Sequence, residues 1–515
     1  MKRFSDFEKP AFTNLTSAIR ALAMDAVQKA NSGHPGMPLG MAEIAEVLWN
    51  HHLRHNPADP AWPDRDRFVL SNGHASILLY SSLYLAGYDV TLDDLKAFRQ
   101  WGSRTPGHPE AGHTAGVEVT TGPLGQGLAN AVGMAIAEQS LRSRFGAEVC
   151  DHHIFVLAGD GCLMEGVSHE AASLAGHLGL GRLVVVYDDN KITIDGSTGL
   201  AFSDDTAARF AAYGWHVEDL GDIANDLDAL EAAVRRGMAA DDRPSLLLLR
   251  SHIAWPSPRF TDDHEAHGNP FTPDEVARTK EILGLAPEEM FPAPDDVVGP
   301  LQSAARRRGA AARAEWQSRL DSWTGDRASW DACWDPAHAA GWVEALPTFD
   351  HGDKQATRQT LAKVLTAVAP HLPGLVSGAA DLTGNTGVKV GGFDLLAREN
   401  PGGRQVAYGV REHAMGAALN GMALHGGILP VGGTFFVFSD YMRPALRLAA
   451  LSGAHVVYVF SHDSVGVGED GPTHQPVEQL MSLRLIPGLQ VIRPADANET
   501  VAAFRTAVTT NGPTA

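Results

Sequence analysis

Two short polar motifs in the middle of the chain carry the residue types of a metal site. The apolar run IFVLA leads into Gly-Asp-Gly, with Asp160 at its centre, and the run LVVVY leads into Asp-Asp-Asn, which ends at Asn190. Carboxylate and amide oxygens, with a backbone carbonyl such as that of Ile192, are the ligands that a hard divalent cation prefers. Taken alone, Gly-Asp-Gly is common in turns, so a plain turn is the alternative. The second motif, Asp-Asp-Asn, favours a cation site over a plain turn.

The elements around these motifs must bring them together. Between Gly161 and Asn190 lie 28 residues, enough for one helix from Glu165 to about His177 and two turns. Continuous β-branched runs on either side of such a helix predict a βαβ crossover with two buried parallel strands. Ligands of open parallel sheets lie outside the carboxyl ends of the strands, so Asp160 and Asn190 are expected in one crevice. The glycines beside Asp160 would let a diphosphate approach the backbone at a helix N-terminus.

Histidines in glycine-rich loops are a second group that could do chemistry. The chain has 23 His. For any one of them, a solvated loop or a satisfied buried imidazole is the simpler explanation. As a set, neutral imidazoles suit a substrate with many hydroxyls that exchange protons near pH 7. Zinc is the competing use, but no HExxH or close Cys/His pairing supports it. The loop histidines are His34, His74, His108, His264, His267, His413, His462 and His474.

One acid and three aromatic residues in the last third have two interpretations each. Glu412 begins an apolar helix in GVREHAM, where it either stabilises the helix N-terminus or shares a proton with a heterocyclic nitrogen. Phe435, Phe438 and Tyr441 recur at every third residue after two glycines. They either pack in the core or form a stacking wall for a flat ring.

Composition restricts the classes of protein to which the chain can belong. Its 515 residues exceed what one core supports, so several domains are expected. The formal charge of −20 argues against nucleic acid or an anionic membrane as a partner. No apolar run approaches the roughly 18 residues of a membrane helix, and the N-terminus lacks the core of a signal peptide. Three unpaired cysteines are typical of a reducing compartment, so a cytoplasmic location is expected.

The pattern of elements predicts an α/β protein with two doubly wound, mainly parallel-sheet domains joined by a long linker. The first domain is expected over residues 1–285, the linker over 286–350 and the second domain over 351–515. Helices are expected at Asn14–Lys29, Leu301–Trp323 and Ala497–Thr509. Further strands are expected at Ser245–Leu249, Leu375–Ser377, Ile428–Val431, Val456–Phe460 and Leu489–Ile492. The last residues, NGPTA, follow a helix with no closing strand, which suggests a fragment of a longer protein.

The motifs together closely resemble those of the transketolases, which are thiamine diphosphate enzymes. ANSGHPG, SNGH, PGHPE, TGPLGQG, GDGC with its distant DN, GVREHAM, TFFVFSDY and GEDGPTHQP occur in the family's order, from about Asn14 to the last residue. The resemblance implies a diphosphate-binding domain, a pyrimidine-binding domain and a third, C-terminal domain that is absent here. It also implies a homodimer in which the cofactor lies between the first domain of one subunit and the second domain of its partner.

The resemblance assigns cofactor contacts to particular residues. Asp160, Asn190 and the Ile192 carbonyl would bind Mg²⁺, Ca²⁺ or Mn²⁺. Glu412 would pair with the pyrimidine nitrogen, so that the cofactor's own exocyclic nitrogen can remove the thiazolium proton. The other cofactor-binding residues implied are His74, Gly122, Pro123, Leu124, Gly161, His264, Phe435, Phe438 and Tyr441.

The implied reaction is reversible transfer of a two-carbon ketol unit through a thiamine diphosphate ylid and an enamine. Donor and acceptor would be sugar phosphates of the xylulose 5-phosphate and ribose 5-phosphate type, in the pentose phosphate pathway or the Calvin cycle. His34, His264 and His474 would act in proton transfer beside Glu412. The substrate-binding residues implied are His34, His108, His264, Arg358, Asn385, His462, Asp470 and His474.

Some positions depart from the family pattern. Gly384 and Asn385 stand where a serine is usual in a phosphate loop, and Asp263 stands where a threonine is common. Related thiamine enzymes such as deoxyxylulose phosphate synthase or dihydroxyacetone synthase are the nearest alternatives. PGHPE with His462, Asp470 and His474 favours transketolase over the former, whereas formaldehyde as acceptor stays open. A different alternative is a silent subunit that needs a separate chain for the third domain.

Overall fold

Five strands of the first half form one parallel sheet, as the buried apolar runs predict, and the two short strands between Ile192 and Ser197 pair with each other antiparallel. The computed structural model describes residues 15–293, 295–350 and 352–515. These residues form two compact units: the first holds residues up to 128, 152–169 and 181–321, and the second holds 129–151, 170–180 and 322–515. In the described part of the chain, no helix has both the length and the apolarity that crossing a membrane requires.

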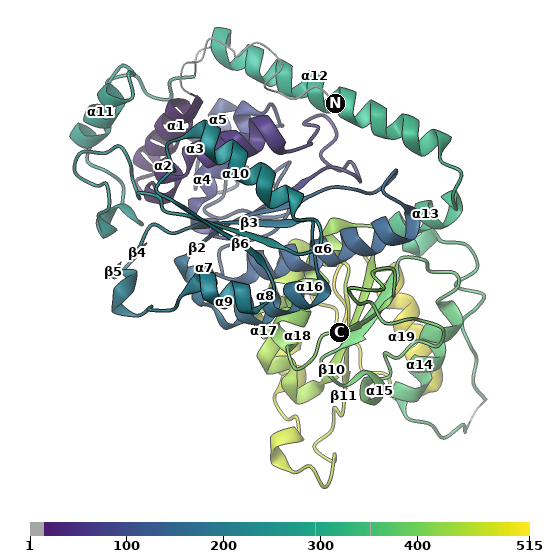
Figure 1. The fold of residues 1–515 in the computed structure, drawn as a ribbon. Helices are drawn as coiled ribbons and strands as arrows, with labels where there is room; N and C mark the ends of the chain where they lie inside the picture. Colours follow the sequence, from purple (N-terminus) through teal and green to yellow (C-terminus); the bar gives the residue numbers. More distant parts are fainter. Residues whose placement is uncertain (1–14, 294, 351) are drawn as a thin grey trace. The chain divides into compact units, whose positions relative to one another are not determined.

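The sheet of the first unit has the order β1-β2-β3-β7-β6, and all its neighbouring pairs are parallel. β2 pairs with β3 so that Gly159 lies opposite Asp188, which confirms the predicted crossover. Figure 1 shows α1, α3, α4 and α10 on one side of this sheet and α7 and α9 on the other. The bounds are β1 Arg67–Leu70, β2 Ile154–Gly159, β3 Leu183–Asp188, β6 His216–Gly221, β7 Ser245–Leu249, α1 Leu15–Ala30, α3 Ala42–Glu46, α4 Ser76–Leu85, α7 Asp160–Met164, α9 Thr206–Ala212 and α10 Leu227–Ala239.

The remaining elements of the first unit are short, with one exception. The helix α12 spans Asp295–Ser322, where the sequence predicts a helical linker segment. The short helices and strands are α2 Gly36–Gly40, η2 Val47–His52, η3 Gly73–Ala75, α5 Leu92–Lys96, β4 Ile192–Thr193, β5 Gly196–Ser197, η4 Thr198–Leu200, η5 His264–Ala266 and α11 Pro273–Ile282.

The second unit has a four-stranded parallel sheet of order β11-β10-β8-β9. α14 and α19 pack on each other, and residues of both join the strands in one apolar core. α16 packs on α17 and on β10, where a Cβ at Gly432 would lie 2.2 Å from a Leu419 methyl group. The bounds are β8 Leu375–Ala379, β9 Gln405–Ala407, β10 Leu429–Phe435, β11 Val457–Ser461, α14 Thr357–Val368, α16 Glu412–His425, α17 Ser439–Ser452 and α19 Ala497–Thr509.

Two long helices, α6 Gln126–Phe145 and α8 Gly166–Leu178, contribute most of their lengths to the second unit. The smaller elements of this unit are α13 Arg327–Trp334, η6 Pro336–His338, α15 Thr383–Thr386, η7 Phe436–Phe438, η8 Pro472–His474 and α18 Gln479–Arg484.

The sequence-based strand at Leu489–Ile492 is wrong. Only Gln490 forms an isolated bridge there, to Thr514, which also bridges Val457. The backbone bonds of this segment join Gln490 and Ile492 to Pro513 and Ala515, which is a pairing too short to make a strand. The other predicted strands and helices are confirmed to within a few residues, and the predicted α/β fold with mainly parallel sheets is correct.

Candidate functional site

Asp160 and Asn190 follow neighbouring parallel strands at the same edge of the first sheet. Asp160 is the residue directly after β2, and Asn190 is the second residue after β3. Both side chains are buried, with 4% and 7% of the residue surface exposed. The expectation that the two motifs meet at adjacent strand ends agrees with this topology.

Only one of the two oxygens of the Asp160 carboxylate has a hydrogen-bond partner among the described residues. Its Oδ1 accepts a hydrogen bond from the Tyr187 hydroxyl, whereas its buried Oδ2 accepts none from the described residues. Burial, with the nearby charge of Asp189, raises the pKa of Asp160 to about 6, although the Tyr187 bond lowers it. An ionised carboxylate with a buried unpaired oxygen is unfavourable unless a cation lies beside it.

Asn190 is held by its neighbours with its amide oriented. Its Nδ2 donates to Asp188 Oδ2 at 2.9 Å, and its Oδ1 accepts from the Ile192 N–H at 2.9 Å. Asp188 Oδ1 in turn accepts from the Ser251 hydroxyl. Burial and the charge of Asp160 raise the pKa of Asp188 to about 7, against the hydrogen bonds from Ser251 and Asn190.

Negative charge exceeds positive charge at these strand ends. Three carboxylates, those of Asp160, Asp188 and Asp189, face one ammonium, Lys191, which lies 2.7 Å from Asp189. The orphaned Asp160 oxygen and the Asn190 amide oxygen are oxygen donors at neighbouring strand ends, and Ile192, whose N–H binds that amide oxygen, follows two residues later. This donor set and the excess negative charge fit a hard divalent cation.

The loop TGPLGQG packs beside this edge. A Cβ at Gly161 would lie 2.7 Å from a Leu124 methyl carbon, and one at Gly122, whose φ is +139°, would lie 3.2 Å from the His108 ring. At Gly73, directly before His74, a Cβ would lie 2.6 Å from the Gly122 nitrogen. The predicted diphosphate residues Gly161, His74, Gly122, Pro123 and Leu124 thus belong to loops in close contact.

Four histidines form one group in the first unit. The His34 ring lies 5.2 Å from that of His74, 6.2 Å from that of His108 and 5.7 Å from that of His267, and the His74 and His267 rings are 4.8 Å apart. Arg99 Nη2 lies 3.2 Å from His34 Nδ1.

Burial keeps these rings neutral. It lowers the pKa of His34 to about 3, with further lowering by His267 and Arg99, and it lowers the pKa of His74 well below the usual value. Burial likewise lowers the pKa of His108 and His267. A neutral imidazole has one N–H donor and one nitrogen acceptor, so the group can bind several hydroxyls.

His264 lies apart from this group. Its side chain is 51% exposed, and its Nδ1 lies 3.3 Å from Asp263 Oδ1. His267, three residues on, is the histidine of this loop whose ring lies beside those of His34 and His74. The sequence placed His267 among the loop histidines without a role, and no signal in the sequence separates it from His264.

Glu412 is the first residue of α16, as predicted, and the first turn of this helix is held by α8. The Ala414 N–H donates to Glu170 Oε2 at 2.9 Å, and Arg411 Nη2 donates to the Ser173 hydroxyl at 3.1 Å. Burial raises the pKa of Glu170; the Ala414 bond lowers it, and the charge of Glu412 raises it further. The sequence analysis missed Glu170 because a distant helix supplies it.

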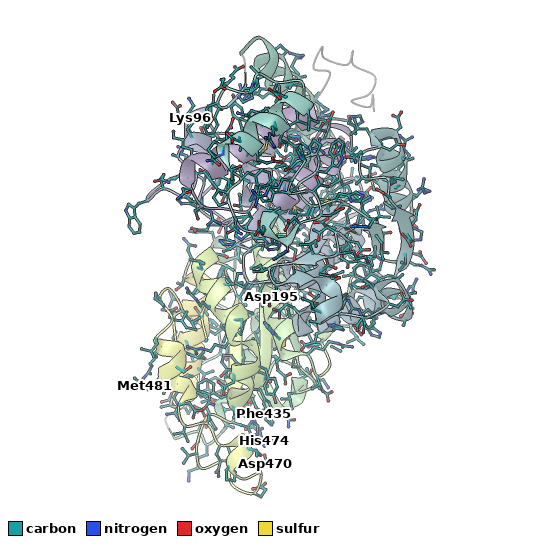
Figure 2. All side chains as sticks on the ribbon, turned by 90° about the vertical axis from the view of Figure 1, so that its left-hand side faces the viewer. Lys96, Asp195, Phe435, Asp470, His474 and Met481 are labelled. Atoms are coloured by element: carbon teal, nitrogen blue, oxygen red, sulfur yellow. The ribbon has the colours of Figure 1, made fainter. Side chains whose placement is uncertain are left out.

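The three predicted aromatic residues form a continuous row. The Phe435 and Phe438 rings stack with centroids 6.1 Å apart and planes 13° apart, and the Tyr441 ring meets Phe438 edge-on at 5.8 Å. His474 lies 5.3 Å from Phe438, and Tyr441 is 65% exposed. In Figure 2, Phe435, His474 and the exposed Asp470 follow one another toward one end of this unit.

Arg358 and His462 meet at the start of α14 and the end of β11. Arg358 Nη1 lies 3.4 Å from His462 Nε2 and donates to the Asn385 carbonyl at 3.4 Å. The Ser461 hydroxyl also donates to that carbonyl, at 3.1 Å. Arg358 and His462 line a cavity of about 400 Å³, and Arg493 lines it too. These contacts bring Arg358, His462 and the Asn385 carbonyl together.

Comparison with known families gives one consistent result. The family model described as transketolase, thiamine diphosphate binding domain, matches residues 12–333, and the one described as transketolase, pyrimidine binding domain, matches residues 353–515. The chain is 52% identical to transketolase 2 of Xanthobacter flavus, over 97% of this chain and 74% of that protein. It is 49% identical to the transketolase of Geobacillus stearothermophilus, over 97% and 76%.

Solved structures agree. A transketolase of Pichia stipitis in complex with sedoheptulose 7-phosphate matches with a TM-score of 0.93 and 43% identity, over 97% of this chain and 75% of that one. A transketolase of Leishmania mexicana matches with a TM-score of 0.93 and 44% identity, over the same shares of the two chains. The chain therefore belongs to the transketolase family and is an enzyme that transfers ketol groups.

Proposed function

We propose that the chain binds thiamine diphosphate through a divalent cation and transfers a two-carbon ketol unit reversibly from a ketose phosphate to an aldose phosphate. The cofactor, when bound, supplies the carbanion chemistry of this reaction. The observation that carries the proposal is the buried, unpartnered Asp160 Oδ2 at the strand end next to Asn190. Mg²⁺ is the expected cation, with Ca²⁺ or Mn²⁺ as substitutes, held also by the Ile192 carbonyl.

The diphosphate is expected between the glycine loops of the first unit. Gly161 and Gly122 offer backbone N–H groups that no side chain of their own covers, and His74 lies against the loop of Gly122. Pro123 has no N–H, so Leu124 supplies the other backbone donor of the segment Gly122–Leu124. Neutral His74 can donate one N–H to a phosphate oxygen without adding charge.

Glu412 is expected to share a proton with the ring nitrogen of the cofactor. Its place at the first turn of α16, held by the Glu170 bond to Ala414, supports a fixed position for this carboxylate. The row of Phe435, Phe438 and Tyr441 supports stacking against a flat ring, because its two parallel rings form a continuous apolar face.

Hydroxyl groups of the substrate are expected to meet the neutral histidines. The ring distances favour His267 over His264 as a member of the set with His34 and His108, and His474 stands beside the aromatic row. These rings would bind hydroxyls and move protons during transfer. Arg358 and His462 would bind the sugar phosphate, with Asn385 and Asp470 near them.

We also propose a homodimer and a reducing compartment. Large apolar side chains of the second unit are exposed at 61% to 76%, which supports burial against a second copy; they are Val410, Tyr441, Val465, Val477, Met481 and Leu485. The three cysteines are free and buried, in keeping with the cytoplasm. Sugar phosphate substrates would place the enzyme in the pentose phosphate pathway or the Calvin cycle.

The test is a depletion experiment on the purified chain. After removal of metal and cofactor with a chelator, formation of a triose phosphate from xylulose 5-phosphate and ribose 5-phosphate should stop. It should return only when thiamine diphosphate and Mg²⁺ are both added. Calorimetry should show cofactor binding that needs the cation. Binding of equal strength in excess chelator would contradict the proposed cation site, and no turnover with both additions would contradict the proposed reaction.

A further inference from the structure

His252 lies between two carboxylates at the carboxyl end of β7. Its Nδ1 is 2.8 Å from Asp262 Oδ2, and its Nε2 is 3.2 Å from Asp222 Oδ2. Both ring nitrogens can donate only when the imidazole is protonated. Burial lowers the pKa of His252, and the charge of Arg250 lowers it as well. The bonds to Asp262 and Asp222 outweigh both effects and raise the pKa above its usual value.

The contact closes a loop of the chain. His252 and Asp262 are the two ends of this loop, and the Asp262 N–H also donates to the Ile253 carbonyl at 3.1 Å. Ala254 and Asp262 each have a φ of +61°. A residue with a Cβ is unfavourable in this left-handed region, so the surrounding contacts must hold the loop in this conformation.

The closed loop lies against the segment that presents His34. The Ala254 N–H donates to the Gly36 carbonyl at 2.8 Å. A Cβ at Gly36 would lie 2.6 Å from Ile253 Cγ1, and one at Gly40 would lie 2.6 Å from the His252 carbonyl oxygen. α2, which follows His34 directly, therefore packs on the first residues of the loop.

The other end of the loop leads to His267. Asp262 is followed by Asp263, which caps η5, and η5 ends one residue before His267. A Cβ at Gly36 would also lie 2.7 Å from the Ala266 carbonyl oxygen. The start and the end of the segment 252–267 thus both pack against α2.

We infer that His252 is a positioning residue, which in its protonated form clamps Asp222 to Asp262 and so sets His267 beside His34 and His74. This role rests on the proposed function of the histidine group. His252 itself touches no member of that group, so it acts through the loop. Because the pKa is raised in the folded chain, the clamp is complete below the unfolded pKa and is lost as pH rises through the folded one.

Trypsin cleavage after Arg259 reports on the clamp without using activity. Arg259 lies within the loop, its side chain is 59% exposed, and its N–H donates to Glu275 Oε1. His252→Gln keeps one donor and removes the charge, so cleavage at this bond should be about tenfold faster than in wild type at pH 6. Cleavage in the variant, measured relative to an added reference peptide, should not depend on pH, whereas wild type should approach the variant as pH rises.

The same variant should lower kcat/KM for the donor sugar about tenfold at pH 6, because a misplaced binding group weakens substrate orientation. This deficit should shrink as pH rises. His338→Gln is the matched control, since His338 bonds Asp335 at 2.9 Å but is 84% exposed. It should alter neither cleavage nor kcat/KM.

Equal cleavage of wild type and His252→Gln at pH 6 would overturn the inference, and so would a deficit of the same size at every pH. The proposed function fails separately: if His267→Asn kept wild-type kcat/KM, the histidine group would not act on substrate, whatever the cleavage result. Relative to the intrinsic exchange of an unfolded peptide at each pH, the protection of the amides of residues 253–262 in wild type should also fall as pH rises, which needs no variant.

Discussion

Asp160 lowers the stability of the folded chain unless a cation lies next to its second oxygen. Burial raises its pKa to about 6, so the ionised form present at pH 7 is disfavoured by the fold. The same feature gives affinity when a divalent cation arrives, because the cation replaces the solvation that the carboxylate lost. Tyr187 bonds only the other oxygen and leaves this one available.

Asp160→Asn should separate these two effects. The uncharged amide keeps the shape and removes the buried charge, so the metal-free variant should unfold at pH 7 at a temperature at least as high as wild type. The gain in Tm on adding Mg²⁺ and thiamine diphosphate should disappear, with cofactor affinity lower by about 100-fold. Asp195→Asn, a change at an exposed acid of the nearby β4–β5 turn, is the control and should behave as wild type. An Asp160→Asn protein that keeps the ligand-induced Tm gain would show that the cation binds elsewhere.

Glu412→Gln should affect turnover and leave binding of the diphosphate end intact. Glutamine keeps the helix start but cannot hold a proton between itself and a ring nitrogen. We expect kcat to fall about 10²- to 10⁴-fold, the usual contribution of a positioned acid or base. The Mg²⁺-dependent Tm gain should persist, because its proposed ligands are in the other unit. Near wild-type turnover of this variant would remove Glu412 from the proposed chemistry.

In the second unit, the backbones of α6 and α16 lie in close contact. This contact holds α16, the helix that begins at Glu412. A Cβ at Gly421 would lie 1.8 Å from the Asn130 carbonyl oxygen, and one at Gly133 would lie 1.9 Å from that of Ala418. The two helices therefore cross where each has a glycine, and neither site can accept a methyl group without a backbone shift. Packing of this kind leaves no mark in apolar periodicity.

Gly421→Ala should lower the free energy of unfolding by about 2–3 kcal/mol, through overpacking against the α6 backbone. Gly237→Ala in α10 is the matched control: it is also a helical glycine, but its Cβ would lie 3.4 Å from the nearest atom, a Leu247 methyl carbon, which is an ordinary contact, so a gain of about 0.5–1 kcal/mol is expected. Urea unfolding with an unchanged m-value measures both. Equal stability of Gly421→Ala and wild type would mean that α16 can move away from α6.

Strand prediction succeeded for buried strands of five or six residues and failed for strands that are exposed or very short. β2, β3 and β7 are covered on both faces, so their apolar runs are continuous and their bounds were found within a residue or two. β6 is an edge strand, half exposed and with two acidic residues, and it carries no such run. β1 and β9, of four and three residues, are too short to show a period.

The residues of the candidate site also fall into two groups: those that the sequence makes predictable and those that it does not. Asp160, Asn190 and Glu412 stand at element ends that the sequence marks, so their places were predictable. His267 and Glu170 acquire their neighbours only through tertiary contacts, the first from the loop closed by His252 and the second from a helix more than 200 residues away. Spacing along the chain holds no record of such contacts.

Two groups of proposed cofactor residues belong to different units of the chain. Asp160, Asn190 and the diphosphate loops are in the first unit, whereas Glu412 and the aromatic row are in the second. In the proposed homodimer, one cofactor takes its cation site from one copy and its acid from the other. Each subunit then contributes half of two sites, so the activity of a single-variant protein shows that a residue is needed but not which copy supplies it.

Mixing two inactive variants distinguishes the possibilities. A dimer of one Asp160→Asn chain and one Glu412→Gln chain has one site with both changes and one site with neither, if sites are shared between copies. Random exchange of equal amounts makes half of the dimers mixed, so activity should return to about a quarter of wild type. If each site were built within one chain, every site would carry one change and the mixture would stay inactive. Dilution below the dimer dissociation constant should abolish the recovered activity as well, because complementation requires two copies in contact.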